Sequence, residues 1–269
     1  MLRVGSVPYL VARPLDEALE DEPGIDLVRL VPAKLAEGLR QGELDVALVS
    51  SIELFRHEGT TWLDGPAVTG EGAVRSVQVF LRRDLEEVRA IALDPSSRMA
   101  ATLVQIIWPT GPGGRPEFVA VEPGRDPREV EADAWLRIGD AALREHLEPG
   151  SPPVFNPSAA WVELTGEICP FALWIARPGV DLRPHAEAFV RAWERGRGRI
   201  DELARQAARD WKVPLEAAAR YLGEEILYDP GARLGPALEA FRDRAAELGL
   251  ADGDLSPRGV SARQAERHA

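Results

Sequence analysis

The chain has 269 residues, of which 45% are hydrophobic and 28% are charged. This balance supplies enough apolar side chains for a large core and excludes a wholly disordered chain. A formal net charge of −12 argues against nucleic-acid binding, and no uncharged apolar stretch approaches the roughly 20 residues of a membrane-spanning helix. With one cysteine and no recognisable export signal, the sequence predicts a reducing, cytoplasmic setting, with neither nucleic acid nor membrane as a partner.

Strand and helix patterns alternate through the first third of the chain. Residues 1–12 loosely mimic a short signal peptide, but Gly5 and Pro8 interrupt them, and residues 2–7 are better interpreted as a buried strand. Further strands are predicted over 25–30 and 44–50, with helices over 14–20 and 32–41. The last strand is nearly all apolar, as in a parallel sheet buried on both faces. The alternation predicts an α/β fold with its ligand crevice beyond the carboxyl ends of the strands.

The middle of the chain repeats this alternation of strand and helix patterns, which predicts a second α/β unit. Strands are expected over 74–82, 90–93, 117–121 and 134–138, with helices over 99–107 and 141–148. Residues 172–176 are expected to return as a strand to the first sheet. Amphipathic helices follow over 184–206, 214–228 and 236–248, and the tail after residue 251 is expected to be frayed.

These patterns predict two lobes, with the second inserted into the first. The first lobe is expected to contain residues 1–83 and 175–269, including the C-terminal helices, and the second lobe residues 84–174. The two connections would then lie near residues 82–88 and 171–178. A cleft between two lobes is a common position for a small-molecule ligand.

Standard catalytic and cofactor motifs are absent from the sequence. It has no phosphate-binding glycine loop, no nucleophile elbow and no metal-type spacing of cysteine and histidine, so no cofactor or metal is predicted. The four histidines are interpreted as solvated surface residues, and Cys169 as a buried apolar side chain.

Serines placed just after predicted strands are the more informative feature. These are Ser50 and Ser51, Ser76, and the pair Ser96 and Ser97. A helix N-terminus offers free N–H groups and a positive dipole end, so it binds carboxylates well. Each serine could instead be only a helix cap. Because several such sites fall on the expected cleft side, we favour a small polar anion as the ligand.

Charged residues near these serines allow two interpretations. Arg13 and Arg98 are the arginines best placed to bind a ligand carboxylate through two hydrogen bonds. Asp140 follows the strand 134–138, where it would either cap the next helix or line the cleft and act on a ligand.

A set of short motifs occurs in a recognisable order along nearly the whole chain. They are Tyr9-Leu10, Pro14-Leu15, Pro32 with Leu35, residues 42–53 (Gly-Glu-Leu-Asp-Val-Ala-Leu-Val-Ser-Ser-Ile-Glu), residues 72–77 (Gly-Ala-Val-Arg-Ser-Val), residues 94–98 (Asp-Pro-Ser-Ser-Arg), residues 138–143 (Ile-Gly-Asp-Ala-Ala-Leu), residues 161–166 (Trp-Val-Glu-Leu-Thr-Gly) and residues 170–174 (Pro-Phe-Ala-Leu-Trp). This order resembles the chorismate dehydratases of the futalosine route to menaquinone.

The resemblance implies a fold, an activity and a set of site residues. The implied fold is that of type II periplasmic binding proteins. The implied activity is a cytoplasmic, cofactor-free lyase that removes water from chorismate to give 3-[(1-carboxyvinyl)oxy]benzoate. The substrate-binding residues carried over from the motifs are Tyr9, Val11, Ser50, Ser51, Ser76, Ser96, Ser97, Arg98, Gly139 and Asp140. Such an enzyme would mainly orient the dianionic substrate and stabilise developing charge.

The chain departs from the family pattern at two places. Val11 stands where the family has an asparagine that is thought to sit at the reacting ring, so the catalytic residue is left open. Met99 and Ala100 stand where the family has two further hydroxyl residues.

Two other functions are weighed against the lyase. One is a binding protein of the same fold without catalysis, for a small anion. The other is the later enzyme of the same route, which would use a catalytic histidine in the cleft.

Overall fold

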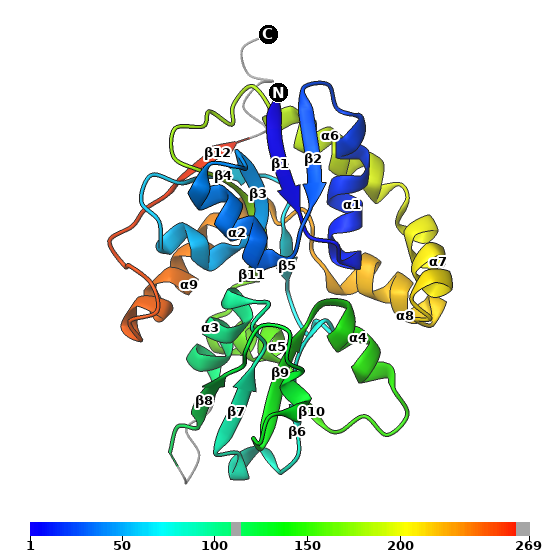
Figure 1. Cartoon of the computed structure of the whole chain (residues 1–269), viewed down its shortest axis with the longest axis vertical. Coiled ribbons are helices and arrows are strands. Elements are labelled where there is room, and N and C mark those ends of the chain that lie inside the picture. Colours follow the sequence, from blue (N-terminus) through cyan, green and yellow to red (C-terminus); the bar gives the residue numbers. More distant parts are fainter. Residues whose placement is uncertain (109–113, 262–269) are drawn as a thin grey trace.

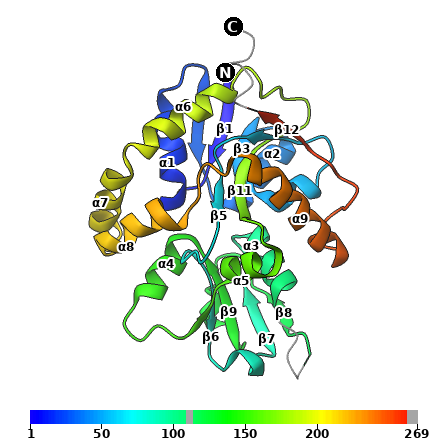
Figure 2. The same ribbon diagram turned by 180° about the vertical axis from the view of Figure 1, so that it is seen from behind.

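The computed structural model describes residues 1–108 and 114–261. They form two α/β lobes that lie one above the other along the long axis of the molecule (Figure 1). The N-terminal strand lies in one lobe, and the polypeptide enters the other lobe and returns, as Figure 2 also shows from behind. The predicted α/β architecture, with the second lobe inserted into the first, is therefore confirmed.

The first lobe is built on a mixed sheet of order β12-β4-β11-β3-β1-β2, with β5 paired to β11. Its strands are β1 (Leu2–Ser6), β2 (Ile25–Arg29), β3 (Val46–Ser50), β4 (Thr61–Asp64), β5 (Val68–Gly70), β11 (Cys169–Ala176) and β12 (Arg258–Ser261). Strand β1 pairs in parallel with β2 and β3, whereas β11 is antiparallel to β3. The central strands are buried almost throughout, as their apolar composition predicts.

The second lobe is built on a smaller sheet of order β10-β6-β9-β7-β8. Its strands are β6 (Val77–Leu81), β7 (Ala90–Leu93), β8 (Glu117–Ala120), β9 (Ala134–Ile138) and β10 (Val154–Phe155), and its helices are α3 (Arg98–Ile107), α4 (Gly139–Leu147) and α5 (Pro157–Thr165). Helix α3 begins after a short loop that follows β7, and α4 begins at Gly139, directly after the last residue of β9. Their N-termini therefore lie at the carboxyl ends of parallel strands, facing the first lobe.

Helices of the first lobe flank its sheet and extend along the junction with the second lobe. They are α1 (Arg13–Asp16), α2 (Pro32–Gln41), α6 (Ala186–Arg197), α7 (Ile200–Asp210), α8 (Leu215–Arg220) and α9 (Leu234–Glu247). Pro32 begins α2, and Gly42, with φ of 73°, ends it in the left-handed conformation. Both views show α8 next to the second lobe, on the side of α4 (Figures 1 and 2).

Several single turns connect these elements and carry site residues. The 3₁₀ turns are Leu10–Ala12, Glu17–Asp21, Ser51–Phe55, Leu85–Glu87, Pro127–Glu129 and Gly231–Arg233. A π-helical turn, Tyr221–Glu225, continues α8 and breaks the single helix expected over 214–228. The helix expected over 184–206 is likewise two helices, α6 and α7, separated at Gly198 and Arg199.

Of the two strands nearest the lobe junction, β11 lies in the first sheet, as expected for residues 172–176, whereas β6 lies in the other sheet from the one expected. Strand β6 pairs with β9 and β10 in the second sheet, whereas the expected boundary at residue 83 assigns it to the first lobe. Strand β11 begins at Cys169 and pairs with β3, β4 and β5 in the first sheet, ahead of the expected boundary at residue 175. The chain therefore crosses within residues 71–76 and returns near residues 166–168. The tail also differs from expectation, because β12 pairs in parallel with β4.

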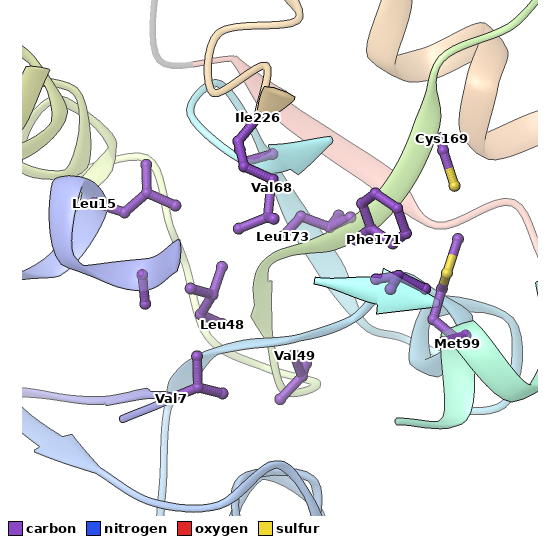
Figure 3. Close-up of a cluster of buried hydrophobic side chains, with 14 of the residues drawn as sticks. Val7, Leu15, Leu48, Val49, Val68, Met99, Cys169, Phe171, Leu173 and Ile226 are labelled. Atoms are coloured by element: carbon purple, nitrogen blue, oxygen red, sulfur yellow. The ribbon is translucent and has the colours of Figure 1, made fainter. Parts of the chain in front are cut away.

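A continuous apolar core passes through the junction between the lobes. Figure 3 shows Met99, from the first turn of α3, beside Phe171 and Cys169 of β11, and these two elements are in contact. Met99 and Ala100 are each only 1% exposed. The two positions at which the resemblance leads us to expect hydroxyls are therefore buried in the core, with Met99 packed against β11.

Across residues 1–108 and 114–261, no helix has the length and apolar composition needed to cross a membrane.

Candidate functional site

A pocket lies between the lobes and contains about 650 Å³ of empty space, including its open mouth. This size is in the range of small-molecule sites. The first lobe contributes the segment after β1, the end of β3 and part of β11. The second lobe contributes the loop before β6, the start of α3 and the start of α4. The carboxyl ends of strands from both sheets thus meet at one cavity, as the sequence predicts.

Most of the residues expected at the site line this pocket. They are Tyr9, Val11, Ser50, Ser76, Ser96, Ser97 and Gly139. Apolar side chains complete its wall, among them Val7, Val68, Phe171 and Ile226. The pocket therefore combines an apolar surface with a few hydroxyl groups.

Three expected site residues make other contacts instead. The Ser51 hydroxyl is buried and donates to the carbonyl oxygen of Pro170 over 2.6 Å. Arg98 forms an ion pair with Glu53, with Nη1 and Oε1 3.1 Å apart. Asp140 binds a backbone N–H of the first lobe. None of these three lines the pocket, so each has a structural contact where we expected a ligand contact.

The expected role of arginine in binding a carboxylate is not supported by this geometry. Arg98 is paired with Glu53, and Arg13 lies 4.0 Å from Glu17. Within the described ranges, no arginine, lysine or histidine lines the pocket. An anion bound there would be held by hydroxyl and backbone N–H groups, without a paired cation.

Ser97 is both a helix cap and a pocket residue. Its Oγ accepts a hydrogen bond of 3.1 Å from the N–H of Ala100 in the first turn of α3. A hydroxyl that accepts from the helix keeps its own hydrogen for another partner. The two interpretations of this serine are therefore compatible, since it can cap α3 and donate into the pocket.

Asp94 connects the loop that carries Ser96 and Ser97 to the end of β9. Its carboxylate accepts from the Ser96 N–H at 2.9 Å, from the Ser96 hydroxyl and from the Ile138 N–H at 3.1 Å. The loop before α3 is thereby held beside the junction of β9 and α4. The sequence shows this residue only as part of a motif, without indicating its role.

Gly139, at the start of α4 in the second lobe, packs next to the ring of Tyr9. Its φ is 65°, a conformation that suits glycine, and its N–H donates to the Ser76 carbonyl oxygen over 2.8 Å. A Cβ at this position would lie 3.5 Å from the Tyr9 ring. Burial is the main reason why the pKa of Tyr9 is raised, with a smaller contribution from the Asp94 and Asp140 carboxylates, so its phenol stays protonated and can donate.

Asp140 connects the two lobes. Its carboxylate oxygens lie 3.0 and 3.3 Å from the N–H of Leu10, which directly follows Tyr9. It is the second residue of α4, and it does not act as a side-chain cap of that helix. Burial raises its pKa, opposed by the Leu10 N–H and by Arg144 and Arg13. The structure thus shows a third role, since Asp140 neither caps α4 nor lines the pocket.

Val11, which stands where the resemblance leads us to expect an asparagine, lies in the pocket wall. Its side chain adds apolar surface, and its carbonyl oxygen accepts a hydrogen bond of 2.9 Å from the Tyr228 hydroxyl. The segment around Tyr9 and Val11 is therefore held by the second lobe through Asp140 and by Tyr228, which lies between the π-helical turn Tyr221–Glu225 and α9.

The fold and the cleft define a class of proteins in which two lobes enclose a ligand. The solved structures similar to this chain include a protein from Archaeoglobus fulgidus, at 18% identity and a TM-score of 0.73, covering 93% of this chain and 98% of that one. They also include the alkanesulfonate-binding protein SsuA from Xanthomonas axonopodis, bound to MOPS, at 16% identity and a TM-score of 0.69, covering 97% and 98%. These likenesses show that the fold is that of periplasmic binding proteins.

Sequence comparison identifies the family more narrowly. A family described as menaquinone biosynthesis matches residues 2–247, and the chain belongs to this family. A curated relative, the chorismate dehydratase of Thermus thermophilus, is 28% identical over 226 residues, which cover 77% of this chain and 81% of the relative.

Proposed function

We propose that the protein is a chorismate dehydratase, a hydro-lyase that forms 3-[(1-carboxyvinyl)oxy]benzoate in the futalosine route to menaquinone. The observation that carries the proposal is the pocket between the lobes, where hydroxyls and two helix N-termini face an apolar wall. Membership of the menaquinone family and the relative named chorismate dehydratase support it. We place the reaction in the cytoplasm, without nucleic acid or membrane as a partner.

The chemistry of dehydration suits such a pocket. Loss of the ring hydroxyl and one ring proton as water makes the ring aromatic, so the elimination needs no oxidant and no redox cofactor. The apolar side chains around Val11 and Phe171 would contact the ring. The hydroxyls of Ser76 and Ser97, with the N–H groups at the starts of α3 and α4, would bind the carboxylates.

The absence of a cation from the described pocket lining favours the substrate as its own base. A carboxylate in an apolar, partly closed pocket is a stronger base than one in water, because burial disfavours its charge. One substrate carboxylate facing the ring would accept the ring proton as the C–O bond breaks, and would pass that proton to the departing hydroxyl, which leaves as water. In this mechanism Val11 shapes the pocket, and the missing asparagine is not required.

Two other functions can be distinguished from the dehydratase. A non-catalytic protein that binds a small anion is favoured by Val11 and by binding-protein neighbours such as the alkanesulfonate-binding protein. The later enzyme of the route would require a histidine in the cleft, but His57, His146 and His185 do not line the pocket, and His268 lies outside the described residues.

Incubation of the purified protein with chorismate tests the proposal, with the products separated by chromatography. We expect 3-[(1-carboxyvinyl)oxy]benzoate to form well above the spontaneous background. Chorismate that binds but is not consumed would leave a binding protein instead.

Replacing Ser97 separates its two roles. Ser97→Ala should weaken binding of the benzoate product by about 1–3 kcal/mol if the hydroxyl donates to a desolvated carboxylate. Ser97→Gly is the matched variant, because glycine caps a helix nearly as well as serine but lacks the hydroxyl. Calorimetry should show the same loss of affinity for both variants. If Ser97→Ala lowers both the affinity and the stability of the helix while Ser97→Gly lowers neither, Ser97 acts only as a helix cap.

A further inference from the structure

The segment that crosses from the first lobe to the second is held by one turn of the C-terminal helices. Residues 71–76 link β5 to β6, and the π-helical turn Tyr221–Glu225 binds this segment at two adjacent positions. The Glu225 carboxylate accepts from the Arg75 N–H at 3.0 Å and from the Arg75 guanidinium. The Tyr221 hydroxyl lies 2.7 Å from the Ser76 Oγ. Turns of π-helix are found frequently at functional sites.

The two hydroxyls of this pair lie in different surroundings. Tyr221 has no exposed surface, whereas Ser76, at 5% exposure, lines the pocket. Among the described residues, Ser76 Oγ is the partner that the structure gives to the Tyr221 hydroxyl. Figure 3 places Ile226, the residue after this turn, in the cluster with Val68 at the pocket wall.

Burial decides the direction of the hydrogen bond between the two hydroxyls. If Ser76 donated, the Tyr221 hydrogen would be buried without an acceptor, and an unsatisfied buried donor is costly. If Tyr221 donates, its hydrogen is satisfied and the Ser76 hydrogen is free to donate into the pocket. The Ser76 carbonyl oxygen is also fixed, because it accepts from the Gly139 N–H over 2.8 Å.

We propose that Tyr221 is a positioning residue that makes Ser76 a directed hydrogen-bond donor to a carboxylate in the pocket. The inference deepens the proposed function and rests on it for the nature of the ligand. Tyr221 does not contact the ligand. It occupies one of the two acceptor positions of the Ser76 oxygen on the buried side, which leaves the hydroxyl hydrogen for the pocket and so favours an anion over a ligand group that must donate.

A double-mutant cycle between Tyr221 and Ser76 tests this inference. The probe is 3-[(1-carboxyvinyl)oxy]benzoate, which the enzyme as proposed does not consume, titrated by calorimetry into the full-length protein. Ser76→Ala should weaken binding about tenfold or more, as expected for a lost bond to a charged group. Tyr221→Phe, which keeps the ring, should weaken it about fivefold. In the Ser76→Ala background, Tyr221→Phe should change the affinity less than about twofold.

Two comparisons distinguish positioning from general destabilisation. Thr60→Val removes another hydroxyl from a largely buried residue, one that bonds the His57 carbonyl oxygen and lies outside the pocket, and it should leave the affinity unchanged. Ser76→Thr keeps a hydroxyl next to Tyr221 and should retain most of the affinity. Effects of Tyr221→Phe and Ser76→Ala that multiply in the double variant would overturn the inference, as would wild-type affinity in Tyr221→Phe.

The experiments distinguish failure of the proposed reaction from failure of the inference about Tyr221. A protein that binds the benzoate but does not convert chorismate contradicts the dehydratase, while the affinity cycle still reports whether Tyr221 acts through Ser76. A protein that converts chorismate but shows no coupling between the two residues contradicts only the inference.

Discussion

Gly139→Val is expected to destabilise the protein by about 2 kcal/mol and to reduce chorismate turnover at least tenfold. Gly139 has a φ of 65°, where a β-branched residue is strained. Its Cβ would already lie 3.5 Å from the Tyr9 ring, so the extra methyl groups of valine would displace the ring from the pocket wall. Chemical denaturation and steady-state kinetics measure the two effects.

Gly150→Ala and Gly139→Ala provide matched controls for backbone strain. Gly150 has a φ of 80°, with nothing within 4 Å of its added Cβ. Gly150→Ala and Gly139→Ala should each lose about 1 kcal/mol of stability, but only the variant at Gly139 should also lower turnover. Equal turnover in all these variants would show that the Tyr9–Gly139 contact has no part in the site.

Asp140→Ala is expected to cost about 1–3 kcal/mol of stability, because it leaves the Leu10 N–H without its acceptor. It should also raise KM for chorismate, since the segment carrying Tyr9 and Val11 loses its connection to the second lobe. Asp140→Asn keeps an acceptor oxygen and should retain most of the stability. Urea unfolding and kinetics of both variants provide the measurement.

The pH dependence of these variants follows from the raised pKa of Asp140. Between the ordinary value of 3.8 and the raised value, the folded protein binds more protons than the unfolded chain. The stability contributed by this carboxyl therefore falls as pH rises through that window and is constant above it. Asp140→Asn removes this dependence, so its stability relative to the wild type should increase from about pH 4 upward.

A comparison with an exposed aspartate shows whether burial is the cause. Asp181 is exposed and accepts from the Arg183 N–H, and its pKa is lowered by the hydrogen bonds from Arg183. Asp181→Asn should therefore lack the relative gain of stability with rising pH. An Asp140→Asn profile parallel to that of the wild type would contradict the assignment of a buried, strained carboxyl.

The sequence predicts the fold class because strand and helix patterns alternate clearly, as in β1, β2 and β3. It also places residues 172–176, the greater part of β11, in the first sheet, but it does not predict that β6 joins the second sheet. Strand β6 is apolar except for the buried Gln78, and a short, mostly apolar strand has the same sequence pattern in either sheet. The pairing of β6 with β9 is decided by tertiary packing, so the expected boundary at residue 83 is wrong.

Local signals predict part of the candidate site. Ser50 ends a strand and Ser97 caps a helix, so both could be placed at the pocket from the sequence, whereas Ser76 lies there in the segment just before β6. Charged residues are less predictable, because their partners come from distant segments. Arg98 meets Glu53, and Asp140 meets the N–H of Leu10, 130 positions away.

The role of Tyr221 could not be predicted from the sequence. Tyr221 lies within an amphipathic helical pattern, where a buried tyrosine is indistinguishable from an ordinary core residue. Its contact with Ser76 depends on the π-helical turn and on a sequence separation of 145 residues. No local pattern indicates that contact.

A crystal structure of the protein with bound 3-[(1-carboxyvinyl)oxy]benzoate tests most directly the central claim, that the pocket between the lobes is the substrate site. The account predicts the aromatic ring against Val11 and Phe171, with carboxylate oxygens within hydrogen-bond distance of the Ser76 and Ser97 hydroxyls. A ligand bound outside this pocket, or one whose carboxylates contact arginines instead of these serines, would contradict it.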